Sequence, residues 1–237
     1  MIPKTIHFCW FGGNNLPEDA KKCINSWKKY LPDFDIKEWN EGNFDIECCE
    51  YVKQAYKMKK WAFVSDYARF WILYHYGGLY FDTDVEIIKD MHSIIERGAF
   101  MGCETIDKCA PGLGLGVNPG LGLYKEILDY YQQLHFDMKN GITETVVDHT
   151  THILKKHGWE GNGSIELIDG IYVYPPEYFC PMDYTTGSLN ITDNTYAIHW
   201  YSASWQSSFS KFKTAIQHIL GKDLTEKIKL LKRKVRG

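Results

Sequence analysis

The chain has 237 residues, 44% hydrophobic and 24% charged, which is the balance of a globular protein and excludes an intrinsically disordered one. No apolar run reaches the roughly 18 residues of a membrane-spanning helix, and no basic-then-apolar leader follows Met1, so we expect a cytoplasmic protein. The net charge of −3 is unevenly spread. Residues 209–237 hold nine Lys and Arg against two Asp and Glu, a net +7, which leaves 18 basic and 28 acidic residues, a net −10, in residues 1–208.

The hydrophobic pattern predicts strands that alternate with helices along most of the chain. The expected elements are a strand at 4–11, a helix at 17–30, a strand at 34–40, helices at 50–59 and 61–76, an apolar run at 79–88, a strand at 99–103, helices at 121–135 and 143–156, and strands at 165–174 and 196–200. This alternation predicts an α/β sandwich around a mainly parallel sheet. We expect one domain over residues 1–208, followed by a basic amphipathic helical extension over 209–237.

Residues 111–122 are rich in glycine and invite a nucleotide-binding interpretation. Their spacing fits neither the dinucleotide fingerprint nor the phosphate-binding loop with its lysine. We therefore expect a flexible loop over this segment.

Asp82-Thr83-Asp84 is the first candidate for chemistry. Residues two apart in an extended chain point the same way, so both carboxylates could serve one hard divalent cation, Mg²⁺ or Mn²⁺. A bare Asp-x-Asp is more often a solvated turn, and we interpret Asp33-Phe34-Asp35 as structural. The pair at 82–84 differs because it follows an apolar strand, and open α/β sheets bind ligands at strand carboxyl ends.

Ser65, Asp66 and Arg69 form a second candidate group on the helix expected at 61–76. Residues three and four apart share a helix face, so the three side chains are neighbours. An arginine among carboxylates can neutralise them or bind a phosphate or a sugar hydroxyl. By itself, the spacing favours a simpler alternative, an ion pair on the helix surface.

These motifs stand in a fixed order that resembles a known family. The segments are Ile2 to Gly12, Trp39-Asn40, Ala62-x-x-Ser65-Asp66-x-x-Arg69 and Tyr74-x-x-Gly77-Gly78-Leu79-Tyr80-Phe81-Asp82-Thr83-Asp84. Together they resemble the glycosyltransferase sugar-binding family that contains the DXD motif, which includes yeast initiating mannosyltransferases and bacterial capsule and lipopolysaccharide glycosyltransferases. The glucosyltransferase domains of clostridial toxins are more distantly similar. The resemblance is dense over residues 2–86 and looser over 196–205.

The resemblance implies a GT-A fold, a nucleotide-sugar donor, Mn²⁺ or Mg²⁺, and retention of the anomeric configuration. Trp10 would flank the donor base, and Asn40 would lie near the donor.

For the catalytic centre, the resemblance implies that Ser65, Asp66 and Arg69 hold the donor's ribose or sugar. Asp82 would contact the ribose and the sugar and lie at the metal, and Asp84 would ligate the metal. The family offers no agreed nucleophile, and we assign Asp66 to sugar positioning rather than to that role.

A late cluster, residues 198–205, combines a histidine with several aromatic rings. A lone histidine beside aromatic residues is more often a satisfied core residue. The resemblance implies instead that His199 completes the metal site and that Ser204 and Trp205 fold over the diphosphate as a lid.

The resemblance implies an enzyme that moves a hexose or N-acetylhexosamine, UDP-linked rather than GDP-mannose, to a glycan or lipid-linked glycan in surface polysaccharide synthesis. The alternatives are a toxin-like protein glycosyltransferase and a non-catalytic sugar-binding protein, which would not need Asp82, Asp84 and Arg69. The acidic body opposes nucleic-acid binding. The apolar stripe of residues 220–235 suits peripheral contact with an anionic membrane or packing on the domain equally well.

Overall fold

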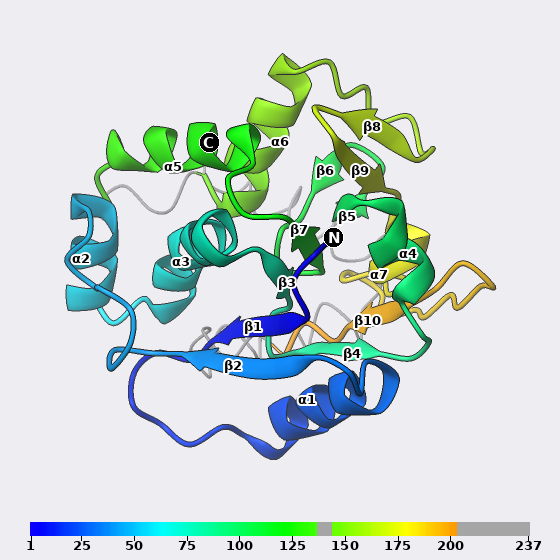
Figure 1. Ribbon diagram of the computed structural model, residues 1–237, viewed down its shortest axis with the longest axis horizontal. Coiled ribbons are helices and arrows are strands. Elements are labelled where there is room, and N and C mark those ends of the chain that lie inside the picture. Colours follow the sequence, from blue (N-terminus) through cyan, green and yellow to red (C-terminus); the bar gives the residue numbers. More distant parts are fainter. Residues whose placement is uncertain (137–143, 203–237) are drawn as a thin grey trace, which may run out of the picture.

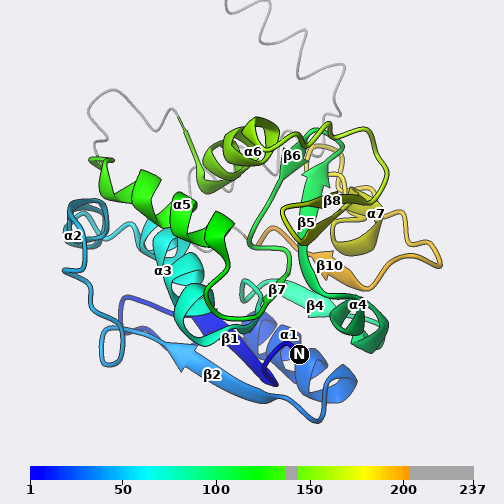
Figure 2. The ribbon, with the colours of Figure 1, turned by 45° about the horizontal axis from the view of Figure 1, so that its top comes forward.

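The computed structural model describes residues 1–136 and 144–202, which form a layered α/β fold (Figures 1 and 2). Its elements are β1 (Thr5–Cys9), α1 (Glu18–Tyr30), β2 (Asp35–Trp39), α2 (Glu50–Lys57), α3 (Trp61–Tyr76), β3 (Gly78–Tyr80), β4 (Val85–Ile87), α4 (His92–Arg97), β5 (Ala99–Thr105), β6 (Lys108–Cys109), β7 (Leu115–Val117), α5 (Gly122–Gln132), α6 (Val146–Lys156), β8 (Glu166–Ile168), β9 (Ile171–Tyr174), α7 (Pro176–Phe179) and β10 (Ala197–His199). No helix in these ranges is long and apolar enough to cross a membrane. The expected extension at 209–237 lies outside the described residues.

The central sheet has the order β2-β1-β3-β7-β5-β9-β8, with β6 paired to β5. Strands β2, β1 and β3 are parallel neighbours, and β5 and β9 run in the same direction beyond the antiparallel β7. Strands β6 and β8 run the opposite way. The predicted α/β fold with a mainly parallel sheet is therefore confirmed, with antiparallel strands inserted.

Helices cover both faces of this sheet (Figure 1). Helices α2, α3, α5 and α6 lie on one side of β1 and β3, and α1 lies on the other beside β4. The anchor of α1 is Trp27, which is fully buried, packs against Phe8 and Phe81, and donates its indole N–H to the Val85 carbonyl at 2.7 Å. This contact fixes the start of β4 against α1.

One expectation for the middle of the chain was wrong. The glycine-rich segment holds β7, a central strand, and the Phe100 ring occupies the space that a side chain at Gly116 would need. Alternating glycines carry little hydrophobic signal, so the pattern concealed a strand that is buried by its neighbours. The apolar run at 79–88 is interrupted at its acidic residues, with β3 before Asp82-Thr83-Asp84 and β4 after it.

The parallel strands end at one edge of the sheet. Trp10 follows β1, Asn40 follows β2, and Asp82 comes two residues after β3. Carboxyl edges are where open α/β sheets bind ligands. The fold thus places sequence-distant candidate residues along a single edge.

Candidate active site at the carboxyl edge of the sheet

The two carboxylates of the Asp82-Thr83-Asp84 motif lie on a turn between β3 and β4. The Val85 N–H donates to the Asp82 carbonyl at 3.0 Å and closes this turn. The motif was expected to be an extended chain, and this expectation was wrong. As a result, the two carboxylates have different hydrogen-bonding and ionic partners.

Asp82 belongs to a buried charge cluster. The Arg69 Nη2 lies 3.1 Å from Asp82 Oδ1 and 3.1 Å from Asp66 Oδ1, and the Tyr80 hydroxyl donates to Asp82 Oδ1 at 3.1 Å. Arg69 and Asp66 are only 3% and 7% exposed, so the alternative of a surface ion pair was wrong. Burial raises the pKa of Asp66 to about 7, although Arg69 opposes that rise.

This cluster orients Asp82 toward the edge of the sheet. Burial opposes the charge of Arg69, but the carboxylates of Asp82 and Asp66 and the Tyr80 ring oxygen hold its pKa above its usual range. The guanidinium also stacks 5.2 Å from the centre of the Tyr80 ring. Asp82 keeps 30% of its side chain exposed, so it is the member of the cluster that a ligand can reach.

Gly112 forms the wall against which Asp82 rests. The Asp82 N–H donates to the Gly112 carbonyl at 2.9 Å, and a Cβ on residue 112 would overlap Asp82 Oδ2. The glycine-rich segment, which was expected to be a flexible loop, is therefore a fixed part of the site. The signal in the sequence was the glycine itself, because the absence of a side chain lets another group lie directly against the backbone.

Asp84 has a different environment, built by a strand more than a hundred residues further along the chain. Strand β10 pairs with β4 and sets His199 opposite Val85, so His199 Nε2 lies 3.3 Å from Asp84 Oδ1. The backbone N–H and the hydroxyl of Ser202 donate to Asp84 Oδ2 at 3.0 and 3.1 Å. Burial would raise the pKa of Asp84, but the His199 charge and the Ser202 hydrogen bonds hold it at about 2.

Asp84 and His199 fit a divalent cation whose remaining ligands come from a bound substrate. Cations of the Mg²⁺ class bind oxygen ligands at about 2.1 Å and use one or two carboxylates together with substrate phosphates, so neighbouring ligands stand about 3 Å apart. The carboxylate oxygen and imidazole nitrogen have this spacing at 3.3 Å. Burial lowers the pKa of His199, but the Asp84 carboxylate raises it to about 10, so a cation would have to displace the imidazole proton before it binds Nε2. Within residues 1–136 and 144–202, no cluster of three or more His, Cys, Asp or Glu could hold a metal unaided.

The other residues that were predicted to contact the sugar donor differ in their surroundings. Trp10 donates its indole N–H to the Asn14 carbonyl at 2.6 Å and lines a pocket beside Asp84. The Asn40 amide is engaged in a local turn with Gly42, and the Ser65 hydroxyl bonds back to the Trp61 carbonyl. Ser204 and Trp205, the expected lid, lie outside the described residues.

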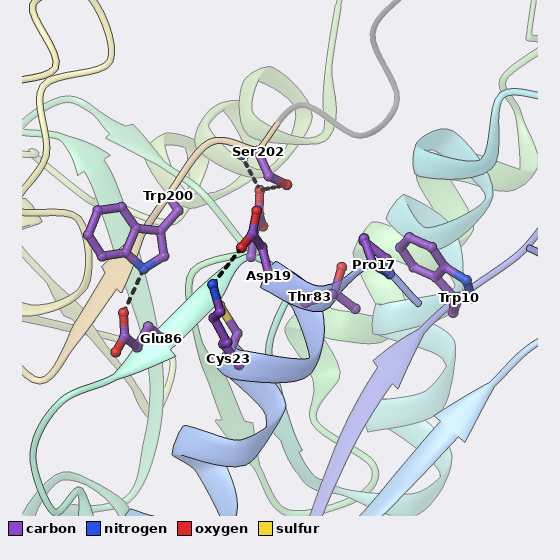
Figure 3. Close-up of a pocket in the computed structure, with 11 residues that line it drawn as sticks. Trp10, Pro17, Asp19, Cys23, Thr83, Glu86, Trp200 and Ser202 are labelled. Atoms are coloured by element: carbon purple, nitrogen blue, oxygen red, sulfur yellow. Dashed lines mark hydrogen bonds and ion pairs between the residues drawn. The ribbon is translucent and has the colours of Figure 1, made fainter. Parts of the chain in front are cut away.

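The pocket next to the motif has a volume of about 520 Å³, within the range of small-molecule sites. It is bounded by the turn after β3, by the start of α1 and by the segment after β10 (Figure 3). Its lining residues are Trp10, Pro17, Asp19, Ala20, Lys22, Cys23, Thr83, Asp84, Glu86, Trp200 and Ser202. Trp200 and Ser202 belong to the late cluster 198–205, although neither was given a role of its own. Glu86 was not anticipated, because the local sequence does not show that it lies beside Trp200.

Glu104 also lies at this edge of the sheet. It stands at the carboxyl end of β5, where the pairing with β6 shifts register. Such irregularities often re-aim a side chain next to an active site. Burial raises the pKa of Glu104, and the nearby His199 lowers it.

Comparison with known proteins agrees with this geometry. Residues 17–101 match the sequence model of the family described as the glycosyltransferase sugar-binding region containing the DXD motif. Inositol phosphoceramide mannosyltransferase 1 of Schizosaccharomyces pombe is 29% identical over 111 residues, 42% of this chain and 33% of that protein. An uncharacterized glycosyltransferase of Acanthamoeba polyphaga mimivirus is 26% identical over 215 residues, 83% of each chain. The chain thus spans about a third of the yeast relative and most of the viral one.

The fold is shared with a solved glycosyltransferase. The PaToxG glycosyltransferase superposes with a TM-score of 0.50 at 21% identity, covering 65% of this chain and 69% of that one. The chain therefore shares the GT-A type of architecture of that glycosyltransferase. Over residues 17–101, the chain is similar to the glycosyltransferase family that carries the DXD sugar-binding region.

Proposed function

We propose that this protein transfers a hexose or N-acetylhexosamine from a nucleoside-diphosphate sugar, UDP-linked, to a glycan acceptor in surface polysaccharide assembly, with a divalent metal and with retention of configuration. The observation that carries the proposal is that two neighbouring carboxylates, Asp82 and Asp84, have different surroundings. Asp84 lies beside His199 with the spacing of cation ligands, while Asp82 is held by Arg69 and Tyr80.

The chemistry of sugar transfer needs both environments. The bond between the anomeric carbon and the diphosphate oxygen breaks, and the bound metal would neutralise the charge that grows on the diphosphate. The anomeric carbon gains positive character, which nearby carboxylates stabilise. Asp82 is the exposed carboxylate of its cluster, and Arg69 fixes its orientation. The acceptor hydroxyl oxygen forms the new bond to the anomeric carbon, and its proton passes to the departing diphosphate oxygen.

The names of the relatives widen the set of donors worth testing. The two fission-yeast relatives are named as mannosyltransferases of inositol phosphoceramide, a lipid. A GDP-linked mannose donor and a lipid-linked acceptor therefore belong in any panel beside UDP-sugars, although UDP remains the donor that we propose.

The test is a thermal-shift panel of UDP-, GDP- and CMP-sugars, each with Mn²⁺ and with EDTA. A ligand that binds only the native state raises the melting temperature by mass action. We expect a shift with UDP-sugars in Mn²⁺ that EDTA abolishes. A shift with GDP-mannose alone would replace the proposed donor, and the absence of any nucleotide-dependent shift would overturn the proposed function.

A further inference from the structure

The pocket beside Asp84 extends beyond the residues that the donor chemistry uses. One end lies at Trp10 and Thr83, next to the motif, and the other lies between α1 and the β4–β10 pair (Figure 3). We propose that this second end, the Trp200–Glu86 subsite, binds the acceptor as an uncharged pyranose ring. The proposal rests on the proposed function and names the substrate class of the same site.

Trp200 provides a preformed platform for a sugar ring. The residue is 42% exposed although it is large and apolar, and it faces the pocket. Its indole N–H donates to Glu86 Oε2 at 2.8 Å, and its backbone N–H donates to the Asp84 carbonyl at 2.9 Å. Aromatic rings offer an apolar face to the C–H groups of a sugar, and a ring already fixed loses little entropy on binding.

Polar groups for sugar hydroxyls lie beside this platform. Glu86 uses only Oε2 for Trp200, and its Oε1 accepts no hydrogen bond from the residues that the structure describes. Across the pocket, Asp19 is paired with Lys22 at 3.1 Å on the first turns of α1. Ala20 and Cys23 add small apolar side chains to the lining, and Pro17 lies at the Trp10 end (Figure 3). Few directed polar groups in a mainly apolar pocket are typical of small-molecule sites.

The charge of the subsite selects against acidic rings. Asp19 is paired to Lys22, and Glu86, at the Trp200 end, forms no ion pair with the residues that the structure describes. A uronic acid or a sugar phosphate placed there would bring a like charge close to it in a partly enclosed space. A neutral hexose meets no such repulsion and can donate a hydroxyl to Glu86.

The position of the subsite suits an acceptor. Trp200 directly follows His199 in the sequence, and its backbone is bonded to Asp84. A ring stacked on Trp200 would therefore lie beside the residues proposed to hold the metal and the donor diphosphate. Transfer requires this neighbourhood, because the acceptor hydroxyl must approach the anomeric carbon closely.

The experiment separates acceptor binding from donor chemistry. Binding of methyl hexopyranosides and of methyl glucuronide is followed by saturation-transfer NMR, which needs no donor. Hydrolysis of the donor without acceptor and transfer to p-nitrophenyl hexosides are measured in parallel. The variants are Trp200→Ala, Trp200→Phe and Glu86→Gln, and the control is Tyr76→Ala, which removes an aromatic ring of similar exposure, 48%, at the end of α3.

We expect Trp200→Ala to weaken hexoside binding and to raise the acceptor KM about tenfold, the equivalent of roughly 1.4 kcal/mol, with donor hydrolysis within about twofold of the unchanged protein. Trp200→Phe should retain part of the binding, and Glu86→Gln should narrow the preference for hexoside over glucuronide. Tyr76→Ala should change neither.

Three results would overturn the subsite. They are no hexoside binding by the unchanged protein, equal binding by Trp200→Ala, or a parallel fall of hydrolysis and transfer in that variant. Hexoside binding that depends on Trp200 in a protein without donor turnover would instead leave the subsite in place and contradict the transferase proposal.

Discussion

The Asp82 carboxylate rests directly on the backbone of Gly112, whose carbonyl accepts the Asp82 N–H at 2.9 Å. A Cβ at position 112 would overlap Asp82 Oδ2, and Arg69 Nη1 lies just behind. The Asp82 carboxylate can therefore occupy its position because Gly112 has no side chain.

Gly112→Ala should displace the Asp82 carboxylate and lower kcat/KM for the donor by at least about tenfold, a loss of roughly 1.4 kcal/mol of transition-state stabilisation. Steady-state kinetics with the donor identified by thermal shift provide the measurement. Gly122→Ala is the matched control, because a Cβ at that position meets nothing within 4 Å. Equal activities of the two variants would show that Asp82 does not need its present position.

Arg69→Ala should destabilise the protein strongly, because it leaves Asp66 and Asp82 without their shared cation. Breaking a buried ion pair from one side costs about 3 kcal/mol or more. Burial already raises the pKa of Asp66 to about 7, so this carboxyl is ionised mainly above neutrality. The loss should therefore be larger at pH 8 than at pH 6, as measured by urea unfolding.

The control for this series is Arg97→Ala, which removes an exposed arginine that stacks 4.3 Å from the Tyr172 ring. We expect a loss below about 1 kcal/mol, the usual value of an exposed cation–π contact. A similar small loss for Arg69→Ala would mean that the buried cluster contributes little to stability.

Asp84→Asn should remove the Mn²⁺-dependent part of the donor's thermal shift and reduce transfer by about a hundredfold or more, a loss of roughly 2.7 kcal/mol, while the fold persists. The amide keeps the shape of the side chain but loses the charge that a cation requires. Asp35→Asn, in the second Asp-x-Asp of the chain, is the control, since that side chain is exposed. Full metal-dependent activity in Asp84→Asn would show that Asp84 is not a ligand of the metal.

His7 should make stability depend on pH between about 6.5 and 4. The buried ring accepts the Trp39 indole N–H at Nδ1, 3.1 Å away, and donates from Nε2 to the Gly77 carbonyl at 3.0 Å, which requires the neutral form. Burial lowers its pKa from 6.5 to about 4 despite the bond to Gly77. The unfolded chain therefore binds the extra proton first, and stability falls as the pH drops through this window, by on the order of 3 kcal/mol.

Urea unfolding at pH 7, 5.5 and 4 measures this slope, and His7→Gln should flatten it. His149, whose pKa is also lowered by burial, acts in the same direction and remains in the variant, so the difference between the two proteins isolates His7. Identical slopes would show that His7 takes up its proton at the same pH in the native and in the unfolded chain.

Much of the fold could be predicted because the pattern of apolar residues is local. The helix expected at 61–76 is present with those bounds, and the buried stripe of α1, including Cys23 and Trp27, follows the helical period. Strand β7 could not be predicted, because Leu115-Gly116-Val117 is too short and too poor in side chains to stand out. Its burial depends on Phe100, a residue from another strand.

The candidate site was predictable in its parts but not in its assembly. The motif and its arginine lie within one stretch of sequence, so Asp82, Asp84 and Arg69 could be proposed together. The partners of Asp84 could not be derived from spacing, because Ser202 arrives through the pairing of β10 with β4. Trp200 and Glu86 meet for the same reason, over a separation that no local periodicity encodes.

The pairing of β4 with β10 has a consequence for how this protein folds. His199 lies opposite Val85 in this small sheet, so two segments that leave the ribosome far apart in time must meet before the site is complete. Contacts between such distant segments form late, since the entropy of the intervening loop has to be overcome first. A nascent chain that has already folded its central sheet would carry both aspartates. It would not bind the proposed donor until β10 docks onto β4.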